Sequence, residues 1–561
     1  MLKRLLPFLA WPAPTRASLR ADLVAGTSVA LILIPQALAY AQLAGVPAYW
    51  GLYAAMLPAV IGALFGSSAW LATGPVALTA LLSAASIAPF ATQGSDAFLA
   101  HTIALALLSG LIQVAFGLAR GGMLFSLLSH PVLMGFINAA TLLIALSQLP
   151  TLLGIKVQTG AHFLYDTWHL AARLGETHLP SLAFGIVAIG MLLAFRRFAP
   201  RLPGVLVTVA VLTAASYFGG YAAAGGRVVG AIPQGLPALA LPAVDFEMLQ
   251  NLIPAAFVIA LISFMEAMSS ARVIAAKTRT DWNENQELIG QGLAKIAASL
   301  CQSLPVSGSF SRSAILHQSG GRTGLASVFS ALLVLLTLLF LTGLLYHLPL
   351  PVLAAIIMVA VLNLANPGAI RRAWQASRDD GAAAIGTFAA TLLFAPNIQN
   401  GILTGILLSL ALFLYRGMTP RAIAVGLHAD GTLRDAARFD LPPLHPLIGI
   451  LRFDAALNFV NAATFADAVL KLERERPGIR FLLVAAGGIN ELDASGAEML
   501  SSLAERLRAD GVTLVISSAK KQVTDVMERI GLDTAIGRDN LYSTDRFAID
   551  GLLARVEDSK A

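Results

Sequence analysis

Long apolar segments recur through the first three quarters of the chain, and they constrain its fold more than any other feature. A helix of about 20 apolar residues spans the hydrocarbon of a bilayer. Backbone amides find no water there, so such segments adopt helices that bond their own amides. With 57% hydrophobic and only 12% charged residues, the chain is predicted to be a polytopic α-helical membrane protein. Fourteen spans are expected, at 22–43, 48–65, 73–87, 99–119, 124–147, 178–198, 203–220, 252–275, 288–302, 309–320, 323–347, 350–364, 380–396 and 399–416.

Lysine and arginine fall mainly into alternate loops. Because cytoplasmic loops are enriched in both residue types, this pattern places both termini in the cytoplasm of a multi-pass protein. We expect no cleavable signal at the N-terminus and a location in the cell membrane, which is the inner membrane in a bacterium. The loops assigned to the cytoplasm hold Arg120, Arg196, Arg197, Arg201, Arg272, Lys277, Arg279, Arg322, Arg371, Arg372, Arg378, Arg416 and Arg421; the opposite loops hold Lys156, Arg173 and Arg227.

A short phrase of glycine and hydroxyl residues occurs twice, each time after a helix that carries one conspicuous polar residue. The first copy, 72–80, follows a helix with Gln36, and the second, 305–314, follows a helix with Glu266. The third and tenth spans, which these phrases open, are among the shortest of the set. Because seven spans per half is an odd number, the second half enters the membrane from the opposite side. The sequence therefore predicts a 7+7 inverted repeat with two half-helices that begin inside the membrane.

Two half-helix N-termini that face one another predict a site for a small anion. The first N–H groups of a helix lack intrahelical partners, and the helix dipole adds about half a positive charge there. Hydroxyl groups supply further donors, and glycines let the backbone approach closely. The alternative for both phrases is close helix packing through small residues. The candidate substrate-binding residues in the two copies are Thr73, Gly74, Pro75, Val76, Ser307, Gly308, Ser309, Phe310, Ser311 and Arg312.

Glu266 and Arg312 are ionisable residues in apolar segments, where a charge is costly and usually functional. Arg312 either contributes its charge to the anion site or serves as a structural cation. Three interpretations of Glu266 stay open. It coordinates a co-transported Na⁺ together with Ser270, it carries a proton during transport, or it holds Arg312 in a structural ion pair. Apart from a co-transported Na⁺ or H⁺, we expect no cofactor and no metal site, since the sequence has no cluster of metal ligands.

The membrane region resembles the sulfate-permease (SulP) family of anion transporters, relatives of the vertebrate solute-carrier anion exchangers. The matching phrases lie at 34–41, 73–75, 285–294, 305–314 and 320–323, and as an ordered set they are highly specific. Together they cover most of the region up to the end of the last predicted span.

This resemblance implies a core domain, carrying the third and tenth half-helices, that moves against a gate domain. It also implies that an anion binds between the half-helices, near Gln36 and Tyr40 of the first helix and Glu266 and Ser270 of the eighth. Sodium-coupled bicarbonate members of the family place an acid and a hydroxyl four residues apart in the eighth helix, as here. They lack the Phe310 to Arg312 pattern, which argues against sodium coupling.

The composition changes after the last predicted span. We expect a cytoplasmic N-terminal segment at 1–21, a transporter domain at 22–420, a linker at 421–445 and a soluble α/β domain at 446–557. Strands are predicted at 447–453, 480–485 and 512–516, and helices at 462–474, from 493 onward, and at 521–530.

This C-terminal domain resembles the STAS module, related to anti-sigma-factor antagonists. In the antagonists a serine is phosphorylated in the loop that matches 493–496, and Ser495 is the matching position. The alternative is that this loop only caps a helix, a role for which aspartate and serine are well suited.

Two classes of function fit these features. One is a dimeric secondary transporter of small anions, of the sulfate, bicarbonate or dicarboxylate class, with an elevator-type shift of the core. The other is an anion-responsive membrane sensor or channel-like protein that signals through its STAS domain to a cytoplasmic partner. An enzyme is not expected, because the chain has no P-loop and no nucleophile–base arrangement. Membrane lipid surrounds such a protein, and the net charge of +6 lies in membrane loops, so no nucleic acid is expected as a partner.

Overall fold

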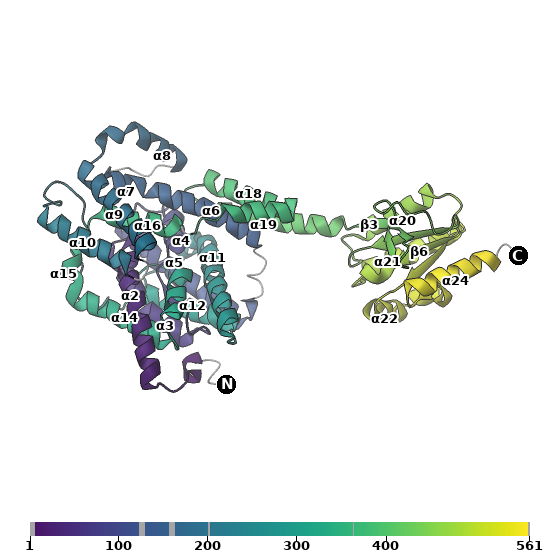
Figure 1. The fold of residues 1–561 in the computed structure, drawn as a ribbon, viewed down its shortest axis with the longest axis horizontal. Helices are drawn as coiled ribbons and strands as arrows, with labels where there is room; N and C mark the ends of the chain where they lie inside the picture. Colours follow the sequence, from purple (N-terminus) through teal and green to yellow (C-terminus); the bar gives the residue numbers. More distant parts are fainter. Residues whose placement is uncertain (1–5, 123–128, 156–162, 200–201, 363, 559–561) are drawn as a thin grey trace. The chain divides into compact units, whose positions relative to one another are not determined.

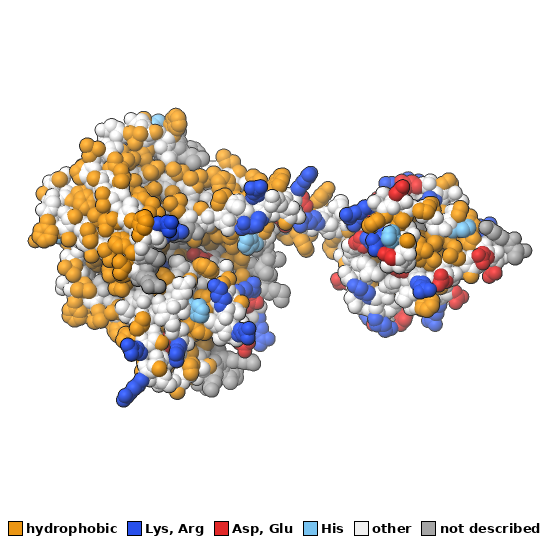
Figure 2. All heavy atoms as spheres, viewed as in Figure 1, with side chains coloured by type: hydrophobic (Ala, Val, Ile, Leu, Met, Phe, Trp, Pro, Cys, Tyr) orange, Lys and Arg blue, Asp and Glu red, His pale blue; other side chains and the backbone are white. Residues whose placement is uncertain are grey.

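The chain folds into two compact units, residues 1–409 and residues 410–561. The structure is a computed structural model that describes residues 6–122, 129–155, 163–199, 202–362 and 364–558. Lys156 and Arg201, used above to orient the chain, lie outside these ranges, as do parts of the predicted spans 124–147 and 350–364. Hydrophobic side chains cover much of the visible surface of the first unit, whereas acidic and basic side chains are interspersed over the second (Figure 2).

Helices lie over all fourteen predicted spans (Figure 1). Within the described residues, eight helices are long and apolar enough to cross a membrane. The number of crossings stays a prediction, because several of the other helices are short. In chain order the helices are α2 (Arg16–Leu43), α3 (Tyr49–Phe65), α4 (Ala77–Ile87), α5 (Asp96–Leu118), α6 (His130–Ser147), α9 (Leu179–Phe198), α10 (Gly204–Phe218), α11 (Phe246–Thr278), α12 (Glu284–Leu300), α13 (Phe310–Gln318), α14 (Leu325–Leu336), α16 (Leu350–Leu362), α18 (Arg378–Leu393) and α19 (Ile398–Met418).

The membrane unit also contains elements that the hydropathy pattern did not predict. The predicted span 323–347 continues beyond α14 through a π-helical turn, Thr337–Leu341, into α15 (Thr342–Leu345). Short helices α7 (Leu149–Leu153), α8 (Phe163–Ala172) and α17 (Pro367–Ala376) lie between the longer ones. These helices are too short for a span-length hydropathy window to detect.

The helices of the membrane unit pack into two groups. One contains α2 to α5 and α11 to α14, and the other contains α6, α7, α9, α10 and α16 to α18. The tightest pair is α5 with α12, where Gly110 and Gly292 meet: a Cβ on either one would lie 2.7 Å from the carbonyl oxygen of the other. Such contact between small residues lets helix backbones approach closely in a membrane. The groups meet mainly where α2 packs against α10 and α16.

The two glycine and hydroxyl phrases form a two-stranded antiparallel ribbon. Strand β1 (Ala72–Gly74) pairs with β2 (Ser307–Ser309), with Thr73 opposite Gly308. Helix α4 begins three residues after β1, and α13 begins directly after β2. Segments from the two halves of the sequence therefore satisfy one another's backbone groups, and both half-helices start at the ribbon.

Two buried carboxylates hold the loops that flank this ribbon. Glu287, in the first turn of α12, accepts hydrogen bonds from the backbone N–H groups of Ser67 and Ser68, both at 2.9 Å. Asp22 of α2 accepts from the N–H of Arg322 at 2.6 Å, and from the N–H and the hydroxyl of Thr323 at 3.1 and 2.7 Å. The segment that leads into β1 and the turn that follows α13 are thus tied to long helices of the same group.

The second unit is built on a six-stranded sheet with strand order β4-β3-β5-β6-β7-β8. Strands β5 to β8 run parallel, and β3 pairs antiparallel with β5. One face of the sheet packs on α20 to α23, and the other packs on α24. The elements are β3 (Ala422–Leu427), β4 (Leu433–Asp435), β5 (Ile448–Phe453), α20 (Ala462–Glu475), β6 (Phe481–Ala485), α21 (Ala494–Ala509), β7 (Thr513–Ser517), α22 (Lys521–Arg529), α23 (Leu532–Ile536), β8 (Leu541–Tyr542) and α24 (Asp545–Asp558).

The expected linker at 421–445 is wrong, because this segment contributes strands β3 and β4 to the sheet. Its short apolar residues pair with β5, and a turn with a positive φ at Gly431 connects the two strands. The N–H of Arg438 and the guanidinium of Arg421 hold the pKa of the Asp435 carboxyl below its usual range. The composition of this segment did not predict a strand, because β5, the strand with which β3 pairs, lies outside the segment.

The Asp22 contacts predict a measurable loss of stability when the carboxylate is removed. In Asp22→Ala, three donors lose their acceptor in a buried region, which should cost about 2–4 kcal/mol. Asp22→Asn, which keeps one acceptor oxygen, should lie between this variant and the original protein. Thermal unfolding of the purified protein in detergent measures the effect. Asp281→Ala, at an exposed loop position, is the control, and equal melting temperatures for the two alanine variants would contradict this role of Asp22.

Candidate functional site

The N-terminus of α4 has no side-chain cap. Val76 is the residue before the helix, its side chain accepts no hydrogen bond, and the first helical N–H bonded to its carbonyl is that of Ala80. The preceding N–H groups of the first turn are therefore left for another acceptor. In contrast, α13 is capped by Ser309, whose hydroxyl accepts a long 3.5 Å hydrogen bond from the N–H of Arg312.

Arg312 reaches from the second half of the repeat to the first. Its side chain is 1% exposed, and Nη1 donates to the carbonyl oxygen of Pro75 at 3.0 Å. Gly74 makes room for the guanidinium, since a Cβ at this position would lie 3.3 Å from Nη2. Within the described part of the chain, Nε and Nη2 have no hydrogen-bond partner. A buried guanidinium with two unused donors is suited to binding an anion.

The structure brings two of the four predicted residues of the first and eighth helices near this guanidinium. Tyr40 of α2 and Glu266 of α11 are both close enough to Arg312 to interact with it electrostatically. Gln36 and Ser270 lie on the same two helices and are buried. Among the described residues, nothing bonds to Gln36 Oε1, Glu266 Oε2 or the Ser270 hydroxyl. Unpaired buried polar atoms are rare in folded proteins, so their number here indicates a ligand or water site.

Some of the predicted hydroxyl donors are used within the protein. The Ser307 hydroxyl donates to the carbonyl oxygen of Ser263 at 2.7 Å, which ties β2 to α11. Thr73 Oγ1 accepts from the Gln291 side-chain amide at 2.8 Å, which ties β1 to α12. A Cβ at Gly308 would lie 2.9 Å from Cβ of Ala267. These three predicted residues therefore position the ribbon by close packing and hydrogen bonding.

Other predicted residues mark the open side of the site. Phe310 is 49% exposed, and Ser311 is also exposed. Pro75 and Val76, in contrast, are buried. The start of α13 therefore faces accessible space, from which a ligand can approach the guanidinium.

The sequence argument missed Lys295, which lies inside α12 directly after the phrase 285–294. This lysine is fully buried, and its Nζ donates to Oε1 of Gln113 at 2.8 Å. It also interacts electrostatically with Glu266. A lysine within an apolar segment is itself a signal of function, and the same criterion that singled out Glu266 would have found it.

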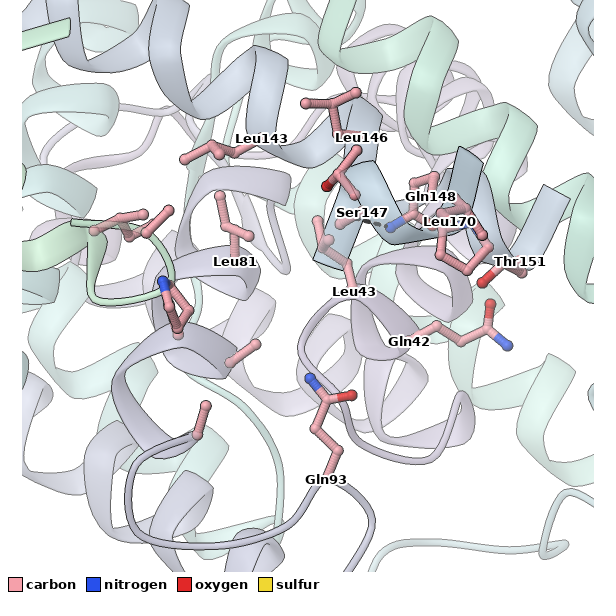
Figure 3. Close-up of a pocket in the computed structure, with 18 of the residues that line it drawn as sticks. Gln42, Leu43, Leu81, Gln93, Leu143, Leu146, Ser147, Gln148, Thr151 and Leu170 are labelled. Carbon is pink, nitrogen blue, oxygen red and sulfur yellow. Dashed lines mark hydrogen bonds between the residues drawn. The ribbon is translucent and has the colours of Figure 1, made fainter. Parts of the chain in front are cut away.

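A cavity lies apart from these residues. It has a volume of about 800 Å³ and lies between the C-terminal ends of α2 and α4 on one side and α6, α7 and the segment 395–398 on the other. Figure 3 shows the polar side chains of Gln42, Gln93 and Thr151 around it. The residues that line it include none of the predicted site residues, although it lies where the two helix groups meet.

In the second unit, Asp493 caps helix α21. Its carboxylate accepts from the N–H of Gly496 at 2.8 Å and from the N–H of Phe459 at 2.9 Å. Ser495 is exposed at the second residue of the helix. Because Asp493 performs the capping, the Ser495 hydroxyl is not needed for it and is accessible from solvent.

Comparison with known proteins supports both parts of this description. The model of the sulfate permease family matches residues 19–387, and that of the STAS domain matches 443–548. A probable sulfate transporter of Mycobacterium tuberculosis is 34% identical, and the match covers 94% of each chain. The sodium-independent sulfate anion transporter of Bos taurus is 31% identical, over 94% of this chain and 88% of that protein.

The fold has a close counterpart among solved structures. The murine solute carrier 26 family member A9 anion transporter, in its inward-facing state, matches with a TM-score of 0.90. The match covers 99% of this chain and 94% of that one, at 22% sequence identity. At this level of identity the comparison establishes the fold, including the C-terminal domain.

The contact between Gly74 and Arg312 predicts a graded loss of anion binding. Gly74→Ala should weaken binding modestly, and Gly74→Val by about tenfold or more, because the added methyl groups displace the guanidinium. Binding of radiolabelled sulfate to the purified protein measures both. Gly190→Val is the matched control, since a Cβ on that helical glycine has nothing within 4 Å; equal affinities in all three variants would exclude this placement of Arg312.

Proposed function

Because the chain belongs to the sulfate permease family, we propose that this multi-pass membrane protein is a secondary active transporter that holds a small anion between the starts of α4 and α13. The family is one of transporters and not of enzymes. The observation that carries the proposal is Arg312, a buried cation with two unused donors, which bridges the two extended segments that lead into the half-helices.

The proposed binding site combines three kinds of donor. Arg312 supplies a full positive charge, the uncapped first turn of α4 supplies N–H groups, and both helix dipoles add positive potential. Gln36, Tyr40 and the exposed Ser311 complete the lining. In a site shielded from water these donors act strongly on an anion, because they are fixed before it arrives.

We propose that the helix group containing α4 and α13 moves as the core against the other group as the gate. The ribbon, the hydrogen bond from Ser307 to Ser263 and the hydrogen bond from Gln291 to Thr73 make this core a single body around the anion. A hydrogen bond of 3.1 Å from Ser86 of α4 to Gln399 of α19 connects it with the last membrane helix. The cavity of about 800 Å³ between the groups would then be the vestibule on the side of the membrane opposite the cytoplasm.

Glu266 is the proposed coupling residue. Its Oε2 has no partner within the described chain, as is also true of the Ser270 hydroxyl four residues later. Both observations favour the two interpretations in which the carboxylate receives a Na⁺ or a proton over a closed ion pair with Arg312. The Bos taurus relative is described as sodium-independent, which argues against Na⁺ for this chain and leaves the proton as the proposed coupling ion.

Sulfate is the first substrate to test, because the relatives are named as sulfate transporters; bicarbonate and dicarboxylates are the alternatives. We further propose a homodimer in the bacterial inner membrane with both termini in the cytoplasm, surrounded by membrane lipid. The C-terminal STAS unit would bind a cytoplasmic partner, and phosphorylation of the accessible Ser495 would regulate that contact. A sensor function would use the same anion site and this unit without net flux.

Uptake into proteoliposomes tests the proposal. A panel of radiolabelled anions is supplied to the purified protein under an imposed H⁺ gradient, an imposed Na⁺ gradient or neither. Gradient-driven accumulation of at least one small anion is expected. Anion binding without any flux would overturn the transporter and favour the sensor.

Replacement of the proposed coupling carboxylate should separate binding from accumulation. Glu266→Gln keeps the size of the side chain but cannot bind Na⁺ as a carboxylate or release a proton, so gradient-driven accumulation should be lost. Binding of the anion should be retained. Glu247→Gln, an exposed position on the same helix, is the control. Accumulation by Glu266→Gln at the level of this control would refute the coupling role.

A further inference from the structure

Lys295 is a second buried cation near the anion site, and it directly follows the family phrase 285–294 in the sequence. It lies in α12, is fully buried, and donates from Nζ to Oε1 of Gln113. Its other described interaction is electrostatic, with Glu266. A buried ammonium is costly unless a nearby negative charge compensates for lost hydration. Glu266 is the carboxylate that provides this compensation.

A chain of hydrogen bonds fixes the lysine relative to the site. Gln113 of α5 accepts from Lys295 and donates from Nε2 to the Ala260 carbonyl at 2.7 Å and to the Ser263 hydroxyl at 3.1 Å. Ser263 lies one helical turn before Glu266 on α11, and its carbonyl receives the Ser307 hydroxyl. Lys295 is therefore connected to β2, the strand from which α13 starts.

The charges around Glu266 do not cancel. Arg312 and Lys295 both interact with it, so two cations stand against one carboxylate. If Lys295 were absent, Glu266 would offset Arg312, and only the helix dipoles would attract an anion. With Lys295 present, the charge of one cation remains in excess, and the two helix N-termini add about half a charge each. The site then offers roughly two positive charges.

We propose that Lys295 is a specificity-determining residue that makes the site selective for divalent over monovalent anions. The inference rests on the proposed anion site and names the charge class of its substrate, which is that of sulfate. Lys295 does not touch the anion in this proposal. It acts electrostatically at a distance. Its positive charge compensates the negative charge of Glu266, so that the positive charge of Arg312 is left for the ligand.

Coulomb's law gives the expected size of the effect. At a given distance a dianion gains twice the energy from a positive charge that a monoanion gains. A loss that weakens nitrate binding by about tenfold should therefore weaken sulfate binding by about a hundredfold. The ratio of the two affinities should fall by about tenfold, whatever the absolute values.

The experiment measures the affinities of sulfate and nitrate for the full-length protein in nanodiscs, by isothermal titration calorimetry. In Lys295→Gln, the ratio of sulfate affinity to nitrate affinity should fall by about tenfold. Lys295→Arg, which keeps the charge, should retain most of it. Ser299→Ala, four residues later on the same helix and also buried, changes no charge and should leave the ratio unaltered.

A paired substitution keeps the test decisive if a single variant folds poorly. Lys295→Gln combined with Glu266→Gln removes one positive and one negative charge, so the excess of Arg312 returns and the sulfate preference should recover. An unchanged ratio in folded Lys295→Gln would overturn the inference, as would failure of the pair to recover it. If the unaltered protein bound neither anion, the proposed function would fail; binding of both with no effect of Lys295 would refute this inference alone.

Discussion

The hydrogen-bonded ribbon between β1 and β2 is the constraint on which the membrane unit depends. Non-helical backbone at the depth of a bilayer is tolerated only where its amides are satisfied by protein or water. Here each extended segment satisfies the other, with Thr73 opposite Gly308, although 234 residues separate them in the sequence. This pairing allows two helices to begin in the interior of the protein, where the first turn of α4 has no side-chain cap. The bonds from Gln291 and to Ser263 then hold the ribbon against α12 and α11.

Buried charge is handled differently at the site and at its edges. Asp22 and Glu287 are each surrounded by two or more hydrogen-bond donors, mostly backbone N–H groups. Such satisfied carboxylates stabilise the loops that they hold. Glu266 and Arg312 instead keep atoms without partners. The contrast separates charges that serve the architecture from those for which we propose a ligand or a transported ion.

Much of this arrangement could be predicted from the sequence, because hydropathy and the duplicated phrase can each be recognised within a short stretch of residues. The helices lie over the predicted spans, and Tyr40 and Glu266 lie close enough to Arg312 to interact with it electrostatically. Features that depend on hydrogen bonds between different elements could not be predicted. Ser307 and Ser311 are serines of the same phrase, and the sequence does not distinguish their roles. In the structure the Ser307 hydroxyl bonds to α11, whereas Ser311 is exposed. Strand β3 depends on pairing with β5, and β4 depends in turn on pairing with β3, so neither is predicted by the pattern of its own residues.

The antiparallel register of the ribbon also limits how these segments can change in length. Successive residues of a strand point to opposite faces, so adding or deleting one residue in β1 or β2 would turn every side chain beyond that point to the wrong face. Glu287 fixes the segment before β1 at Ser67 and Ser68, and the Ser303 hydroxyl, which donates to the carbonyl oxygen of Trp50 at 2.6 Å, fixes the segment before β2, so no slack remains to absorb such a change. Insertions and deletions should therefore be tolerated in the exposed loops. They should be excluded from the stretches 67–76 and 303–309, unless the lengths of both stretches change together.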